Sequence, residues 1–188
     1  MKKILHILHS EMGGTADVVF SILQKKNKLF NEEILFIGPT LNKNYVNVLN
    51  KNKIKLTYIK SYRYLYLYSA SNTFFFLLKK RFDIILIHNY QIFSVLLFKL
   101  FFNIKIVYID HKAQNLKNYK DHLCIFMMKF FSSKLVFVNK KNYGFYKKSC
   151  QAYSKKFLYI ANPVNINFYN NSKKKKNKVF LYWNGLKN

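Results

Sequence analysis

Acidic residues are scarce in this chain, and so is arginine. The 188 residues include 7 aspartates and glutamates against 33 lysines and arginines, which gives a formal net charge of +26. A globular protein this basic commonly meets a polyanion, either a nucleic acid or an anionic membrane surface. Arg63 and Arg81 are the only arginines, yet arginine is the residue that reads base edges and phosphates bidentately. This scarcity argues against specific recognition of nucleic acid. Two explanations of the positive charge stay open: binding to an anionic membrane surface, and a plain compositional bias toward lysine and asparagine.

Cysteines and long apolar runs are also few. Cys124 and Cys150 form no CxxC motif, so we expect a reduced, cytoplasmic chain without a disulfide framework. The N-terminal apolar run is short and is interrupted by histidines, which argues against a signal peptide. The most apolar window, residues 92–102, has eleven residues and contains Lys99, whereas a membrane span needs about twenty. We therefore expect a cytoplasmic protein, with a peripheral position at the inner membrane face as a further option.

The abundant residues are apolar, at 51% of the chain, and their order predicts the fold. Runs of strand length alternate with segments of helical period, which is typical of a parallel α/β sheet. We expect a Rossmann-like parallel sheet with helices on both faces. The expected strands are 3–9, 33–38, 55–59, 83–88, 105–109, 134–138 and 157–160, and the expected helices are 18–23, 41–50, 91–102, 116–131 and 140–150. Segment 61–80 stays open, because its alternating tyrosines fit either a strand or a loop that leads into a helix.

The composition changes abruptly near residue 170. Segment 171–178 contains only lysine, asparagine and serine, and residues 179–183 are then uniformly apolar. A polar, charged segment of this kind is typical of a linker, and a strand without partners is marginal alone. The sequence therefore predicts a domain over 1–170, an interdomain linker over 171–178, and the start of a truncated second domain at 179–188.

Gly13 and Gly14 stand where the first expected strand gives way to a helix. Glycine lets the backbone approach a ligand closely, and the free amides of a helix start bind phosphate oxygens. Ligands of open α/β sheets also lie at the carboxyl ends of the strands. The spacing is not GxGxxG, which disfavours a dinucleotide. A purely structural turn is the alternative.

Histidines follow two other strands at the same edge of the expected sheet. A neutral imidazole at His111 could donate to a sugar hydroxyl or stabilise charge at an anomeric carbon. His88, its neighbour Asn89, and Glu11 in the first loop are candidates for contacting an acceptor. A loop histidine bonded to backbone, a helix cap at His88 and a solvated Glu11 are the alternatives. Because the sequence offers no Ser/His/Asp set, paired carboxylates or metal-ligand cluster, we expect no metal and no other cofactor.

Taken in order, these segments resemble the N-terminal domain of family-4 glycosyltransferases, which have the GT-B fold. The resemblance covers roughly residues 1–170. The segments that carry it are KILHILH at 3–9 with GGT at 13–15, FDIILIHN at 82–89, KIVYIDH at 105–111, KLVFVN at 134–139 and YIANPV at 159–164.

The resemblance implies retaining transfer of a hexose from a nucleotide sugar to a glycan or lipid-linked acceptor. The reaction would serve bacterial capsule, cell-envelope polysaccharide or lipopolysaccharide synthesis. The resemblance also implies that the donor diphosphate lies at Gly13 and Gly14. It implies that the donor sugar lies at His111, which would be the catalytic residue. The family's donor-binding C-terminal domain is not in this sequence, so we expect the chain alone to be inactive until that domain is supplied in cis or in trans. A basic polyanion-binding α/β module and half of a GT-B nucleotide-sugar epimerase are the alternatives.

Overall fold

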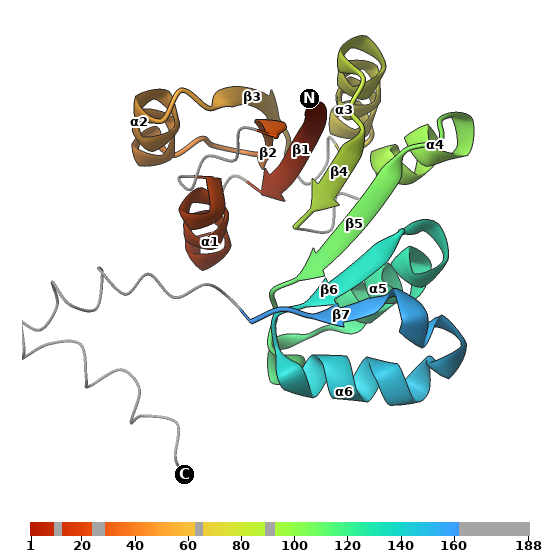
Figure 1. Ribbon diagram of the computed structural model, residues 1–188. Helices are drawn as coiled ribbons and strands as arrows, with labels where there is room; N and C mark the ends of the chain where they lie inside the picture. Colours follow the sequence, from red (N-terminus) through yellow and green to blue (C-terminus); the bar gives the residue numbers. More distant parts are fainter. Residues whose placement is uncertain (10–12, 24–28, 63–65, 89–92, 162–188) are drawn as a thin grey trace, which may run out of the picture.

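Seven parallel strands form the centre of the molecule. The computed structural model describes residues 1–9, 13–23, 29–62, 66–88 and 93–161, and within these ranges the strands form one sheet in the order β3-β2-β1-β4-β5-β6-β7 (Figure 1). The strands are β1 (Lys2–His9), β2 (Phe30–Gly38), β3 (Lys55–Lys60), β4 (Ile84–Ile87), β5 (Lys105–Asp110), β6 (Lys134–Phe137) and β7 (Phe157–Tyr159). The helices are α1 (Gly13–Leu23), α2 (Lys43–Lys51), α3 (Tyr66–Lys80), α4 (Phe93–Phe101), α5 (Tyr119–Phe131) and α6 (Lys140–Ser149). Two short 3-10 helices, Gln114–Leu116 and Gln151–Lys156, complete the described chain.

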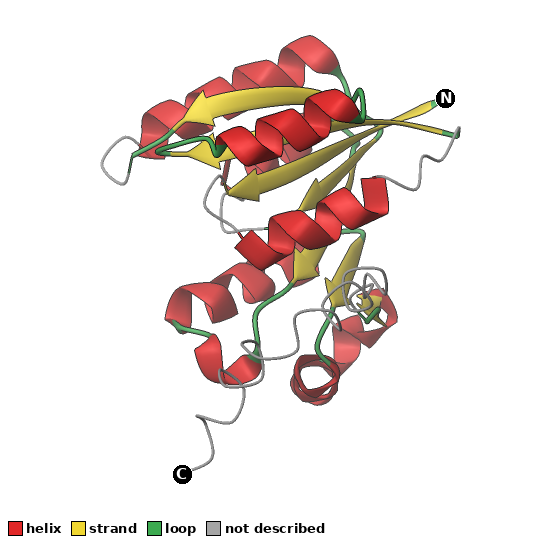
Figure 2. Cartoon of the chain, turned by 90° about the vertical axis from the view of Figure 1, so that its left-hand side faces the viewer, coloured by secondary structure: helices red, strands yellow, loops and turns green. Residues whose placement is uncertain are grey.

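Helices cover both faces of the sheet (Figures 1 and 2). Successive side chains of a strand point to opposite faces, so β1 contributes to two cores. Leu5 and Ile7 belong to the larger core, which also takes buried residues from α3, α4, α5 and α6. Leu8 belongs to the smaller core beneath α1 and α2. The expected Rossmann-like α/β fold, with a parallel sheet and helices on both faces, is confirmed.

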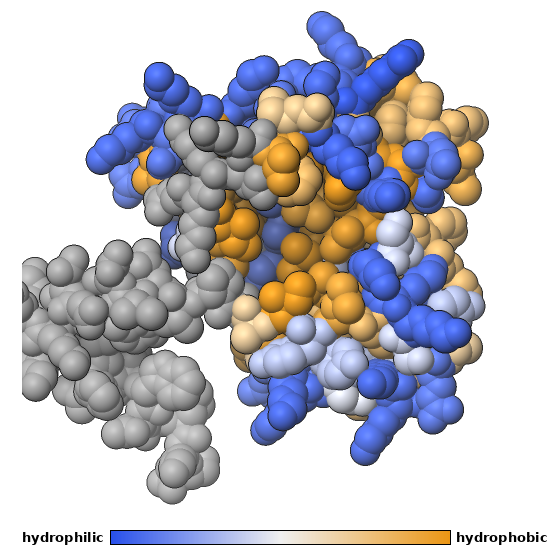
Figure 3. All heavy atoms as spheres, viewed as in Figure 1, coloured by the Kyte–Doolittle hydropathy of each residue, from blue (hydrophilic) through white to orange (hydrophobic). Residues whose placement is uncertain are grey.

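The cover is uneven between the two faces. On the face that carries α1 and α2, the register aligns Leu86 with Val107, and Ile109 with Val136. Leu86, Val107 and Ile109 are only half-buried, and Leu158 of β7 is 39% exposed. Figure 3 shows apolar side chains gathered in the middle of this face, over β5 to β7. The strands around β5 therefore border an open, partly apolar surface.

Most expected elements lie where the sequence placed them, but the helix expected over 116–131 is wrong at its start. Asn118 begins α5 with a capping box: its Oδ1 accepts from the backbone N of Asp121 at 3.1 Å, and its own N donates to Asp121 Oδ2 at 2.7 Å. Such reciprocal bonds satisfy two amides that a helix start leaves unpaired. The preceding Gln114–Leu116 is therefore a separate 3-10 helix.

Segment 61–80 is resolved in favour of a helix. α3 begins at Tyr66, so the strand interpretation of the alternating tyrosines is wrong for its second half. Residues 63–65 and 162–188 lie outside the described residues. The linker at 171–178 and the second domain at 179–188 therefore stay predictions.

Candidate functional site

A cavity of about 590 Å³ lies at the carboxyl edge of the sheet, where β1, β4 and β5 end. His9 closes β1, His88 follows β4, and His111 follows β5, and all three line the cavity. Thr15, in the first turn of α1, lines the same cavity. This edge is where open α/β sheets bind their ligands.

The two expected phosphate-binding glycines are the first two residues of α1. The first four amides of a helix have no partner within that helix, so they are available to an anion. A Cβ added at Gly14 would meet nothing within 4 Å, and its φ is not positive. Neither backbone conformation nor packing therefore requires a glycine at position 14. The space beside the helix start is open.

His88 and His111 are brought into contact, and His6 joins them. His88 Nδ1 lies 3.0 Å from His111 Nε2, and the rings stack with centroids 5.2 Å apart. On its other side, His88 Nε2 lies 3.3 Å from His6 Nδ1, with centroids 5.5 Å apart. His6 was not among the predicted site residues, because in the sequence it is only one residue of an apolar strand. The three imidazoles form a row that crosses from β1 to the end of β5.

Burial keeps the imidazoles of His88 and His111 neutral. His88 is buried, and desolvation, followed by the proximity of His6 and His111, holds its pKa well below the usual 6.5. Desolvation lowers the pKa of His111 to about 4. At neutral pH both rings are therefore uncharged, so each has one N–H donor and one acceptor nitrogen. His111 Nδ1 is buried without a hydrogen-bond partner among the described residues.

Buried charges fix the loop that carries His111. Asp110 accepts from Lys117 Nζ at 2.5 Å and from Asn142 Nδ2 at 2.9 Å, and the Lys117 side chain is fully buried. Asn142 Nδ2 also donates to the Lys112 carbonyl at 2.6 Å, and Lys112 Nζ donates to Asp121 Oδ2 at 2.8 Å. These bonds tie the loop to α5 and α6. This framework was not predicted, and its one signal in the sequence is the Asn118–Asp121 spacing of a capping box.

The two carboxylates that line the cavity are each paired with a lysine. Asp110 and Asp121 line the cavity, and each has a lysine ammonium within 2.8 Å. A carboxylate held in this way is a structural counter-charge to its lysine. The uncharged groups that line the cavity beside these pairs include the imidazoles of His88 and His111.

Two further predicted site residues, Glu11 and Asn89, lie outside the described residues, so their acceptor role stays a prediction. Within the described ranges, no group of three or more His, Cys, Asp or Glu side chains is arranged to hold a metal ion. In the same ranges, no helix has the length and apolar character needed to cross a membrane.

Comparison with known proteins establishes the fold. No protein-family model and no curated protein matches the sequence. Solved structures do: Anabaena HepE in complex with UDP-glucose has a TM-score of 0.70 at 13% identity, over 93% of this chain and 49% of that one. The lipopolysaccharide outer core galactosyltransferase WaaB has a TM-score of 0.65 at 16% identity, over 87% and 46%. A UDP-N-acetylglucosamine 2-epimerase has a TM-score of 0.63 at 13% identity, over 86% and 48%.

At these identities the likeness concerns the fold. The chain has the Rossmann-like domain fold of GT-B glycosyltransferases and epimerases. It spans less than half the length of each of these three structures.

Proposed function

We propose that this chain is the acceptor-side half of a GT-B glycosyltransferase. The enzyme transfers a sugar from a nucleotide-sugar donor to a glycan or lipid-linked acceptor, with retention of configuration. One observation carries the proposal: a single cavity is bordered by the first turn of α1 and by His111, in a fold shared with a UDP-glucose complex. The α1 amides at Gly13 and Gly14 bind the donor diphosphate, and the neutral imidazole of His111 contacts the donor sugar.

The rest of the reaction requires a second half. The nucleotide pocket and the further cations on the diphosphate belong to a donor-binding domain, supplied in cis or in trans. The chain alone is inactive on this proposal, and the reaction needs no metal ion. The acceptor belongs to the cell-envelope polysaccharide or lipopolysaccharide class, and the enzyme works in the cytoplasm.

The outer side of α5 supports a membrane-bound acceptor. Tyr119, Leu123, Phe126 and Phe130, which we call the outer stripe, follow each other at helical spacing and are all exposed. Lys129 Nζ lies 3.8 Å from the Phe126 ring centroid and 5.0 Å from that of Phe130. Exposed aromatic side chains with neighbouring lysines bind the interface of an anionic bilayer. We propose that this stripe rests on the inner leaflet and brings the cavity to a lipid-linked acceptor.

An epimerase half is the second candidate, because an epimerase structure matches the fold almost as well as a galactosyltransferase does. The products of the completed enzyme separate the two candidates. A transferase releases the nucleoside diphosphate and extends an acceptor. An epimerase returns an altered sugar or sugar nucleotide when no acceptor is present.

A titration of the labelled chain with UDP-glucose tests the site directly. We expect weak binding that shifts the backbone amide signals of Gly13 and Gly14 and the His111 imidazole signals. Gly14→Ala leaves the fold intact, because the new Cβ has open space, but it narrows the approach to the α1 amides and weakens binding about tenfold or more. Gly144→Ala is the matched control: Gly144 is also helical, with nothing within 4 Å of an added Cβ.

Two results would count against the proposal. The first is equal binding by both glycine variants. The second is the absence of any shift with a panel of UDP, GDP and ADP sugars. Displacement of all signals by heparin, with no response to sugar nucleotides, would favour the polyanion-binding module instead.

A further inference from the structure

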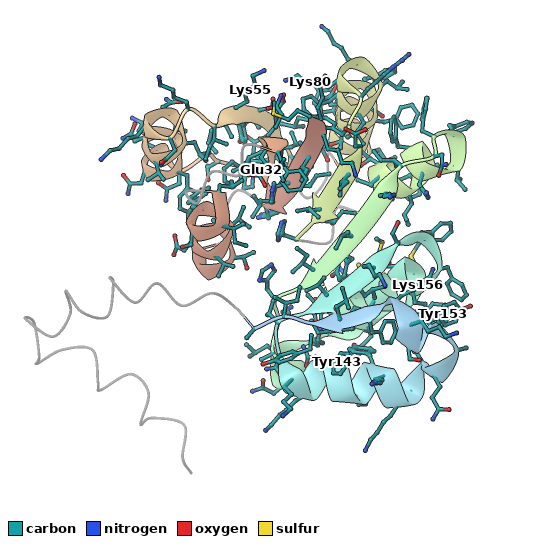
Figure 4. All side chains as sticks on the ribbon, viewed as in Figure 1. Glu32, Lys55, Lys80, Tyr143, Tyr153 and Lys156 are labelled. Carbon is teal, nitrogen blue, oxygen red and sulfur yellow. The ribbon has the colours of Figure 1, made fainter. Side chains whose placement is uncertain are left out.

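The row of imidazoles continues to a carboxylate. His6 Nε2 lies 3.7 Å from Glu32 Oε1, and this nitrogen has no hydrogen-bond partner among the described residues. Glu32, His6, His88 and His111 therefore follow one another from β2 across β1 and the end of β4 to the end of β5. The Glu32 side chain is 20% exposed and that of His6 is 2% exposed, so the row runs from a partly solvated carboxylate into a dry interior. Figure 4 shows Glu32 beside β1 and β2.

A row of neutral imidazoles can be hydrogen-bonded in two directions. Each ring donates through one nitrogen and accepts through the other, so the choice at one ring fixes the choice at the next. In one direction, protons point from His6 toward His111, and His111 Nδ1 carries the proton. In the other, they point from His111 toward His6, and His111 Nδ1 is a bare acceptor.

The charge of Glu32 selects between these directions. A carboxylate oxygen presents lone pairs and no donor hydrogen, so across 3.7 Å Glu32 favours the His6 tautomer whose proton is on Nε2. His6 Nδ1 then accepts from His88 Nε2, across 3.3 Å. His88 Nδ1 in turn accepts from His111 Nε2, across 3.0 Å.

We infer that Glu32, His6 and His88 are positioning residues that hold His111 in the Nε2–H tautomer, with Nδ1 as the acceptor nitrogen. His111 lines the cavity, and its Nδ1 is buried and has no hydrogen-bond partner among the described residues. In this tautomer the ring presents a lone pair at Nδ1, which attracts a hydroxyl hydrogen and repels a phosphate oxygen. On the proposed function, on which this last step rests, the tautomer therefore favours the sugar end of the donor over its diphosphate beside His111.

Nitrogen-15 NMR of the histidine side chains tests this inference on the unliganded chain. At pH 7.5 we expect His88 and His111 to be Nε2–H tautomers, seen in the long-range couplings between ring protons and nitrogens. Glu32→Gln replaces an obligate acceptor with an amide that also donates, so both directions become accessible. The single His111 tautomer should then give way to a mixture of the two.

Glu33→Gln is the matched control. Glu33 is the next residue of β2, so its side chain points to the opposite face of the sheet from that of Glu32. It pairs with Lys80 Nζ at 2.8 Å and with Lys55 Nζ at 3.9 Å. This change should leave all three histidine tautomers as they are. The inference is overturned by Nδ1–H at His111 in the unchanged chain, which includes the case of a doubly protonated His6 that drives the row in reverse. An unchanged single tautomer in a folded Glu32→Gln chain overturns the role of Glu32.

The tautomer and the function can fail separately. If the chain binds no sugar nucleotide but has His111 in the Nε2–H form, the proposed function is contradicted and the inference about the tautomer is supported. Binding of UDP-glucose by a chain with the opposite tautomer would do the reverse. The measurement on the unchanged chain needs no variant to fold.

Discussion

The loop after β5 and the outer side of α5 invert the usual arrangement of a soluble protein. Behind the cavity, charged groups are buried: Asp110 is 4% exposed, and the Lys117 side chain that pairs with it is fully buried. On the outer stripe, apolar rings are in solvent, with Tyr119 74% and Phe126 52% exposed. Buried charge is tolerated only when it is paired and hydrogen-bonded. Exposed apolar side chains that gather in one stripe mark a surface that meets something else.

The largest effect on stability is expected when the buried Asp110–Lys117 pair loses its lysine. Lys117→Met leaves the Asp110 carboxylate buried without its counter-charge, held by the hydrogen bond from Asn142 Nδ2 at 2.9 Å. We expect a loss of about 3–5 kcal/mol in the free energy of unfolding, measured by urea denaturation. Lys120→Met, on the exposed start of α5, is the control and should change the free energy of unfolding by less than about 0.5 kcal/mol. Equal effects of the two changes would mean that the Asp110–Lys117 pair does not hold the loop.

Acid should also destabilise the protein, through the buried histidines on and beside this loop. The pKa of His111 is lowered from 6.5 to about 4 by burial, so between these values the unfolded chain binds a proton that the folded chain does not. Stability due to this group is complete above pH 6.5 and falls as the pH decreases toward 4. The loss is about 1.4 kcal/mol per pH unit, or about 3 kcal/mol in all. His88, whose pKa is also lowered, adds to the loss in the same direction.

Urea midpoints measured between pH 7.5 and pH 4 check this dependence. His111→Asn should flatten the curve by about one proton over that interval, because asparagine does not titrate. Parallel curves for the two proteins would show that His111 is no less basic in the folded chain than in the unfolded one.

The smallest effect on stability is expected at the outer stripe. Phe126→Ser should lower the free energy of unfolding by only about 1 kcal/mol, because the ring is already half in solvent. Binding to phosphatidylglycerol vesicles should weaken about tenfold, since the ring enters the interface there. Phe145→Ser, with a similarly exposed ring (49%) on α6, is the control for a general loss of surface apolarity. Equal vesicle binding by the two variants would exclude the stripe as the membrane-facing surface.

The sheet was predictable because a parallel strand covered on both faces is a continuous apolar run. β1 is a run of this kind, and both β1 and β5 fall within a residue of their predicted bounds. The start of α5 was missed although its signal was present, since Asn118 and Asp121 have capping-box spacing. The apolar periodicity of residues 116–131 obscured that signal.

The site was predictable only in part, for a related reason. His111 and His88 could be placed at one edge because the carboxyl ends of parallel strands meet there. His6 could not be joined to them from the sequence, because the contact depends on β1 and β4 being neighbours. The pairing of Asp110 with Lys117 depends on the path of a loop, and no periodicity encodes such a path.

The central position of β1 also governs when the protein can finish folding. Its register partners in β4 lie 80 residues further along the chain, as in the pairing of Ile4 with Ile84. A ribosome that adds roughly 5–20 residues per second leaves one edge of this apolar strand open for several seconds before β4 emerges. Contacts between residues so distant in sequence also slow folding. The nascent chain therefore exposes this apolar strand early and covers it late, which makes β1 a segment that a chaperone would have to shield.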